Sequence, residues 1–175
     1  MTQPLPETLL RQRAQTLAAP RLDDKTTEAP LTLMTLHVDE ETYAVPAEQV
    51  IEVVTAPQTT HLPGQPDALR GVFNYRGRLL AHVDLGCWLG HPPAEPDHLL
   101  ILQVDSDLFG LSTGVLGDTL SCDPAALDPR VDPYTTLETG RFTGVLMDEG
   151  RPVLVVNLNT LTEHIKTSLS GGHSQ

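Results

Sequence analysis

The sequence predicts a mainly β protein made of two small β-barrel subdomains that pack against each other. From Leu31 onward, short apolar runs alternate with turn residues, as in chains of short strands. Two patterns also occur twice in the same order, which indicates that one β unit was duplicated. Each copy spans only about 50–60 residues and would bury a marginal core alone, so we expect the copies to share a core.

The first repeated pattern is a strand, an acidic turn and a second strand that opens on an aromatic residue. It reads LHVDEETYAV at 36–45 and LQVDSDLFGL at 102–111. The second pattern is a hairpin whose turn ends in Gly-Arg, GVFNYRGRLLAHVDL at 71–85 and GVLMDEGRPVLVVNL at 144–158. A longer connector in the second copy, DPAALDPRVDPY, separates the two patterns further.

The remaining segments are assigned in chain order. Residues 1–30 read as a short helix followed by a polar linker; the helix either rests on its own domain or binds a partner. Residues 31–165 form the main domain of two intertwined β subdomains, with an approximate switch near 86–97, and 166–175 form a flexible tail. We expect few helices in the main domain: a turn after Pro46, one near Gly86–Leu89 and one from Asn159 to Ile165.

Composition argues against several classes of function. A formal net charge of −12 disfavours nucleic acid and anionic membrane as partners, and the chain has no run of 18 apolar residues. The N-terminus lacks the basic start and apolar core of a signal peptide, so a cytoplasmic location is expected. The histidines and the two cysteines make no metal-binding motif, and the sequence shows no recognisable motif of a catalytic nucleophile with its base. We therefore predict no catalysis, no metal and no cofactor.

Arginines are concentrated in the first copy of the hairpin, and the repeat provides an internal comparison. Arg76 aligns with Glu149 and Arg70 aligns with Thr143, so the fold does not require arginine at either position. A residue that the fold does not require, carried on a loop of a rigid scaffold, is a functional candidate. By contrast, Arg78 aligns with another arginine and is interpreted as structural.

Two further polar residues stand among apolar ones. Glu52 lies within VIEVV, where it either points outward from a strand or pairs with an arginine of the hairpin; Asp118 is its aligned residue. His82 lies in the alternating strand after the hairpin turn, where we expect a half-buried or edge position rather than a ligand role.

These motifs give the run from Leu31 to Ile165 a resemblance to the CheW family of chemotaxis coupling proteins. The resemblance rests on TYAVPAEQVIEVV, LRGVFNYRGRLLAHVDL and GRPVLVVNLNTL. Five residues match the family's middle motif, which has Asn-x-Arg-Gly before an apolar strand ending Asp-Leu. They are Asn74, Arg76, Gly77, Asp84 and Leu85. Tyr75, within this motif, departs from the aliphatic residue that the family usually has there.

The resemblance implies two packed five-stranded, SH3-like barrels without catalytic activity. It implies an adaptor that joins the cytoplasmic tip of a chemoreceptor to the regulatory domain of a CheA-type histidine kinase. On this analogy the protein-binding surface includes Arg76, Glu52, Val50, Asn74, Tyr75 and Arg70. The alternative is a β-barrel regulatory module that binds a small molecule, which would require a well-formed pocket with convergent polar groups.

Overall fold

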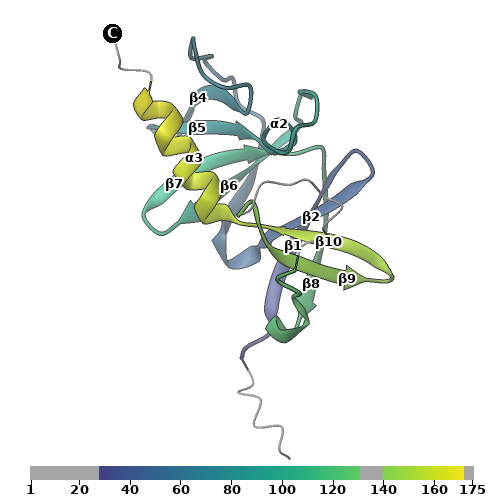
Figure 1. Ribbon diagram of the computed structural model, residues 1–175. Coiled ribbons are helices and arrows are strands. Elements are labelled where there is room, and N and C mark those ends of the chain that lie inside the picture. The colour runs from purple at the N-terminus through teal and green to yellow at the C-terminus, as the bar shows by residue number, and fades with distance from the viewer. Residues whose placement is uncertain (1–27, 131–139, 172–175) are drawn as a thin grey trace, which may run out of the picture.

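Two five-stranded sheets account for most of the described chain (Figure 1). The computed structural model describes residues 28–130 and 140–171. The first sheet has the strand order β8-β1-β2-β10-β9 and the second β3-β6-β7-β5-β4. We call the parts built on them the first and the second subdomain. The mainly β fold of two packed five-stranded subdomains is therefore confirmed.

The strands of each sheet come from both halves of the chain. The first sheet contains β1 (Leu31–Val38), β2 (Glu41–Pro46), β8 (Val115–Cys122), β9 (Phe142–Asp148) and β10 (Arg151–Val156). The second sheet contains β3 (Val50–Thr55), β4 (Leu69–Tyr75), β5 (Arg78–Asp84), β6 (His98–Val104) and β7 (Asp107–Ser112). Each subdomain thus takes two strands from one copy of the repeat and three from the other.

This exchange corrects the predicted switch near 86–97. That segment joins β5 to β6, and both strands lie in the second sheet. The chain crosses between the sheets instead at the 3-10 turn η1 (Ala47–Gln49), which follows Pro46 as expected, and at 113–114. Neither copy forms a subdomain from its own strands alone. The two copies bury their apolar faces against each other, because a unit of this size would bury only a marginal core by itself.

Strand register confirms the duplication. Leu36 pairs with Tyr43 in the first sheet, and Leu102 pairs with Phe109 at the same place in the second. In both sheets the second strand of this hairpin then pairs in parallel with the strand that closes the other copy of the repeat. Residues aligned by sequence therefore occupy equivalent positions in the two subdomains.

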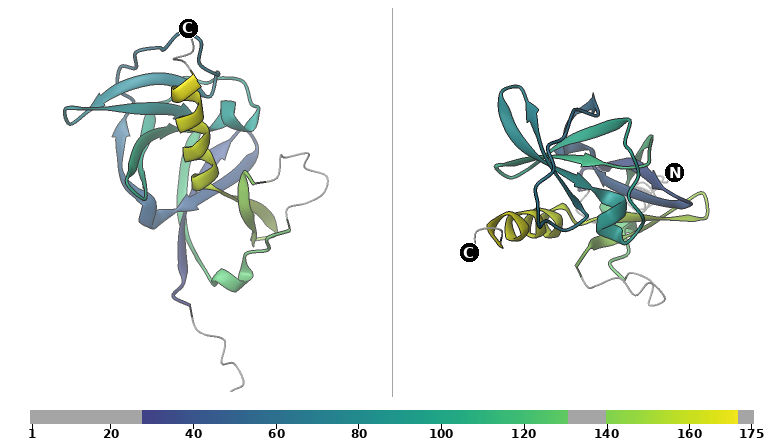
Figure 2. Two further views of the ribbon diagram at one scale, coloured as in Figure 1. Left: turned by 60° about the vertical axis from the view of Figure 1, so that its left-hand side comes forward. Right: turned by 90° about the horizontal axis from the view of Figure 1, so that it is seen from above.

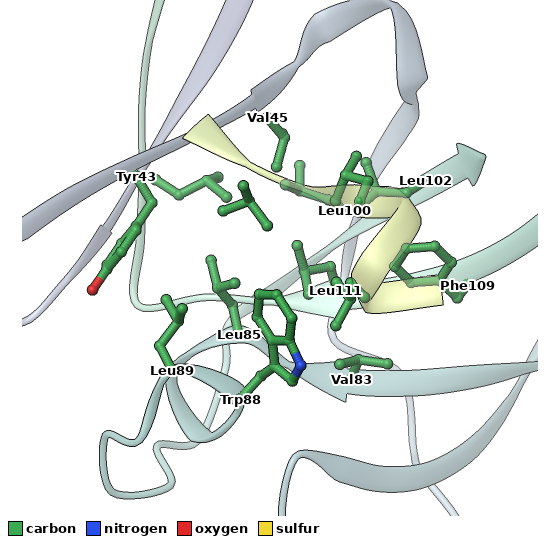
Figure 3. Close-up of a cluster of buried hydrophobic side chains, with 14 of the residues drawn as sticks. Tyr43, Val45, Val83, Leu85, Trp88, Leu89, Leu100, Leu102, Phe109 and Leu111 are labelled. Atoms are coloured by element: carbon green, nitrogen blue, oxygen red, sulfur yellow. The ribbon is translucent and has the colours of Figure 1, made fainter. Parts of the chain in front are cut away.

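One continuous core joins the two subdomains (Figure 3). Tyr43 and Val45 of the first sheet face Leu100, Leu102 and Leu111 of the second. Burying a side chain of this size stabilises the fold by roughly 1.5–3 kcal/mol. Two satellite clusters fill the separate subdomains: Leu33, Ala44, Leu146, Val153 and Val155 in the first, and Phe73, Leu80, Leu99 and Ile101 in the second.

Equivalent caps begin the two α-helices of the described residues. Asp84 Oδ1 accepts a hydrogen bond from Cys87 N at 3.0 Å at the start of α2 (Leu85–Leu89). Asn157 Oδ1 accepts one from Thr160 N at 3.3 Å near the start of α3 (Leu158–Gly171). These side chains satisfy backbone donors that the first helical turn leaves unpaired. A 3-10 turn, η2 (Pro124–Ala126), follows β8.

Helix α3 runs past the end predicted at Ile165, so residues 166–171 belong to the helix and not to a tail. Its buried residues stop at Ile165, and that is why apolar spacing alone ended the helix there. Lys166 Nζ lies 2.7 Å from Asp107 Oδ2, a contact between the helix and the second subdomain. The helix runs alongside the strands of that subdomain (Figure 2). The helix expected within residues 1–30 lies almost entirely outside the described residues.

Candidate protein-binding surface

The β4–β5 hairpin ends in a tight turn at Arg76 and Gly77. Their φ angles are 49° and 80°, and Glu149 and Gly150 repeat them at 46° and 79° in the β9–β10 hairpin. Positive φ at both central residues matches the right-handed twist of the flanking strands. Asn74 Oδ1 accepts a hydrogen bond from Gly77 N at 3.0 Å and holds the turn closed.

Glu52 on β3 receives two side chains of this hairpin. Arg76 Nη2 lies 3.0 Å from both carboxylate oxygens of Glu52, and the Tyr75 hydroxyl donates to the same carboxylate. The guanidinium also lies 5.1 Å from the centre of the Tyr75 ring. The hydrogen bond to Glu52 raises the pKa of Tyr75. The sequence left two positions for Glu52, and the structure shows the one in which its carboxylate pairs with an arginine of the hairpin.

The Arg76 side chain remains accessible although it is paired. Its exposed fraction is 71%, against 32% for Glu52. Glu52 and Tyr75 therefore orient the guanidinium without enclosing it. One face of the guanidinium stays free to meet a second carboxylate, which charge-assisted hydrogen bonding favours.

Apolar side chains lie exposed beside this contact. Ile51 and Val53 alternate with Glu52 along β3 and are 48% and 41% exposed, while Leu79 on the hairpin is 74% exposed. Val50, a residue of the predicted protein-binding surface, is half-buried and packs against the shared core. Sequence reasoning missed Ile51, Val53 and Leu79, although strict alternation in VIEVVT is the signal that would have placed the first two on the outer face.

Arg70 is not part of the same contact. It occupies a bulge in β4, and its Nη2 lies 3.1 Å from Glu95 Oε1 and 3.4 Å from the carbonyl oxygen of Ala94. Its Nη1 lies 3.8 Å from Asp84 Oδ2, and the side chain is 22% exposed. Arg70 therefore holds the loop after α2 against the second subdomain, and a role in partner binding stays a prediction.

A cavity of about 580 Å³ lies between this loop and the segment after β3. His82 lies on its wall and is only 3% exposed, which corrects the half-buried or edge position expected for it. Its ring nitrogens lie 2.7 Å from Thr59 Oγ1 and 3.0 Å from Ser112 Oγ. Burial, reinforced by the charge of Arg70, lowers the pKa of His82 to about 4.

Two polar side chains of this cavity, His82 and Arg70, have partners within the chain. His82 has two hydroxyl partners, and Arg70 is shared among a carbonyl and two carboxylates. A ligand would have to displace these partners, so the cavity gives little support to a small-molecule module.

Polar contacts fix the two subdomains relative to each other. Arg141, directly before β9, donates from Nη1 to the carbonyl oxygen of Trp88 at 2.6 Å, and its guanidinium lies 5.2 Å from the Trp88 ring centre. His91, after α2, has ring nitrogens 2.8 Å from Asp39 Oδ2 and 3.2 Å from Glu41 Oε2. These contacts connect the two subdomains outside the shared core. The sequence contained no signal that paired these residues.

Two classes of feature are absent from the described part of the chain. Within residues 28–130 and 140–171, no helix has the length and apolar character needed to cross a membrane. In the same ranges, no three histidine, cysteine or carboxylate side chains are grouped closely enough to hold a metal ion.

Comparison with known proteins gives a consistent result. The family model "CheW-like domain" matches residues 32–166. The chemotaxis protein CheW of Rhizobium meliloti (strain 1021) is 31% identical over 132 residues, covering 74% of this chain and 85% of the relative. Protein PilI of Pseudomonas aeruginosa is 29% identical over 133 residues, covering 70% of each chain. The crystal structure of the scaffolding protein TtCheW from Thermoanaerobacter tengcongensis superposes with a TM-score of 0.66 at 22% identity, covering 73% of this chain and 88% of that one.

Proposed function

Because the chain belongs to the CheW-like domain family, we propose that it is a non-catalytic scaffold that joins a chemoreceptor to a CheA-type histidine kinase. The observation that carries this proposal is the family match, which spans both subdomains from residue 32 to residue 166. The partners are the kinase's regulatory domain and the cytoplasmic tip of the receptor. The protein therefore acts in the cytoplasm.

The mechanism is positional. A scaffold with two binding faces transmits a movement only if the faces keep a fixed relation. The core shared between the sheets and the Arg141–Trp88 contact support such rigidity. A shift of the receptor then changes the position of the kinase instead of being absorbed inside the adaptor.

The hairpin end of the second subdomain is the proposed contact surface. Arg76 presents an oriented, exposed guanidinium in a chain whose net charge is −12, and Leu79 adds exposed apolar area beside it. A local positive group on an acidic protein selects an acidic patch on the partner. Charges of this kind set partner choice and association rate more than affinity, while apolar contacts supply the binding energy.

Binding of the purified chain to a CheA regulatory domain and to a receptor-tip fragment tests the proposal. Titration calorimetry is expected to show binding of the wild-type chain and at least tenfold weaker binding of Arg76→Glu to one of the two partners. Arg130→Glu, the same charge change at an exposed arginine on the other subdomain, is the matched control and should bind normally. If the wild-type chain bound neither partner, the scaffold function would be rejected.

A charge exchange separates a direct role of Arg76 from an orienting role. In Glu52→Arg/Arg76→Glu the ion pair forms again with its direction reversed. Continued weak binding of this double variant would mean that the partner contacts the guanidinium itself. Recovery of binding would mean that the pair only holds the hairpin in place, and a direct contact would be discarded. Circular dichroism checks that each variant is folded.

A further inference from the structure

The first subdomain has an open cavity where the second has a filled end. The cavity has a volume of about 370 Å³ and lies between β1, β2, β8 and the β9–β10 hairpin. Charged or titratable residues line much of its wall: His37, Asp118, Asp148, Glu149 and Arg151. The two hairpins lie at opposite ends of the molecule (Figure 2), so this end is separate from the surface around Arg76.

Replacement of large apolar residues by small polar ones explains the opening. The register places Thr35 where the second subdomain has Ile101 and Asp148 where it has Tyr75. In the second subdomain, Ile101 is fully buried and Tyr75 packs against the same cluster. Smaller side chains at equivalent backbone positions leave volume that nothing else in the first subdomain fills.

The second subdomain also shows which group suits the equivalent site. There, the guanidinium of Arg76 binds the carboxylate of Glu52 at 3.0 Å. Asp118 is equivalent to Glu52, but Glu149 stands at the position of Arg76. The second subdomain thus has a guanidinium bound to a carboxylate at this place in the fold. The first subdomain has the equivalent carboxylate, Asp118, but no arginine at the position of Arg76.

The charge of the cavity favours a cation. Asp118, Asp148 and Glu149 contribute three negative charges and Arg151 one positive charge, for a net charge of −2 with His37 neutral. His37 Nδ1 lies 3.1 Å from Thr42 Oγ1, so one of its ring nitrogens already has a partner. Asp148 is half-buried, where an arriving cation would be less screened by water than on an open surface.

We propose that this cavity binds an arginine or lysine side chain presented by a partner protein. The cation takes the place that Arg76 occupies in the second subdomain and bridges Asp118 and Asp148. The cavity is large enough for the side chain and part of its backbone. The inference stands on the geometry of the first subdomain and does not depend on the scaffold function proposed above.

Peptide titration of the ¹⁵N-labelled full chain tests this inference. The probe is acetyl-Gly-Arg-Gly-amide, and the control peptide replaces arginine by citrulline, which has the same shape without the charge. We expect saturable shifts of the amides around Asp118, Asp148 and Glu149 with the arginine peptide alone. Shifts spread evenly over acidic residues elsewhere on the surface would overturn the proposal, because they would reflect only the net charge of −12.

Two variants sharpen the test without kinase or receptor. Glu149→Arg recreates the arrangement of the second subdomain. The new arginine side chain should occupy the site in place of the peptide and weaken peptide binding at least tenfold. The turn accepts this residue, because Arg76 has nearly the same φ as Glu149. Glu48→Arg, the same charge change at an exposed residue of η1, is the control and should bind almost as well as wild type. Equal weakening by both variants would reject the site.

Discussion

The two subdomains have the same strand order and register but differ at their hairpin ends. In the second, Tyr75, Ile101 and Arg76 on Glu52 close the end. In the first, threonines and carboxylates leave it open and acidic. Turns and caps at equivalent places, each depending on a few residues, are the same in both subdomains. The two copies therefore have the same backbone and differ in the residues at their hairpin ends.

The largest expected effect comes from a glycine common to both subdomains. Gly71 has φ 143°, and a Cβ there would lie 2.0 Å from the carbonyl oxygen of Thr60. Gly71→Ala must therefore move the backbone, and we expect a loss of about 3–4 kcal/mol in the free energy of unfolding. At the equivalent Gly144 a Cβ would lie 2.6 Å from the carbonyl oxygen of Asp128, so Gly144→Ala should cost less.

Urea denaturation of the two glycine variants measures this difference. Gly77→Ala is the control for strain without a clash, because its φ is 80° and no atom lies within 4 Å of the added Cβ. It should cost about 1–2 kcal/mol. Equal losses for Gly71→Ala and Gly77→Ala would show that the close approach of the Thr60 backbone does not determine the cost.

The second effect concerns the packed hairpin end of the second subdomain. Ile101→Thr places in the second subdomain the residue that the first has at Thr35. Ile101 is fully buried in an apolar cluster, so the lost packing and the buried hydroxyl should together cost about 3 kcal/mol. Thr35→Val removes only a hydrogen bond of 2.7 Å to the Asp118 carbonyl oxygen and should cost about 1 kcal/mol.

Thermal unfolding of these two variants compares the ends directly. A larger loss for Thr35→Val than for Ile101→Thr would contradict the view that the second end is packed and the first is open. The wild-type chain provides the reference in the same buffer.

The third effect is a pH dependence confined to the second subdomain. Burial lowers the pKa of His82 to about 4, below its ordinary value of 6.5, whereas Val155 stands at the equivalent position of the first. Between these values the unfolded chain binds a proton that the folded chain does not. Stability is therefore complete above pH 6.5 and falls as the pH drops toward 4, by about 2 kcal/mol at pH 5.

Chemical denaturation at pH 7 and pH 5 measures this loss. His82→Gln retains a polar side chain beside Thr59 and Ser112 but does not titrate. The pH dependence of this variant should be smaller than that of wild type by the stated amount. An unchanged pH dependence would place the responsible group elsewhere among the carboxylates.

Much of this comparison could be predicted from the sequence. The repeat, the hairpin turns and the equivalence of Arg76 with Glu149 follow from matched patterns, because turn residues and period-2 alternation are local signals. The pairing of Glu52 with the hairpin was one of two alternatives that the sequence left open. The structure shows that it exists.

Other features depend on contacts that no local pattern contains. Alternation identifies β3 and β8 as strands but does not say in which sheet each pairs, so the sequence predicts intertwined subdomains without locating the crossings at η1 and at 113–114. The sequence predicts a half-buried or edge position for His82, yet the side chain is buried because Thr59 and Ser112, 23 and 30 residues away, satisfy both ring nitrogens. The open end of the first subdomain is a difference in volume, which becomes visible only when equivalent positions are compared.

The smallest expected effect is on stability at the two turns. Arg76 is 71% exposed, and an exposed ion pair contributes little because water screens it and side-chain entropy opposes it. Arg76→Ala should therefore lower the free energy of unfolding by less than about 1 kcal/mol, and Glu149→Ala by no more. A loss above about 2 kcal/mol for Arg76→Ala, measured by urea denaturation, would make the pair with Glu52 a structural element of the second subdomain. The difference between the two turns would then reflect folding rather than binding. Weak partner binding by Arg76→Glu would count as evidence for a contact only after correction for the fraction of the variant that is folded.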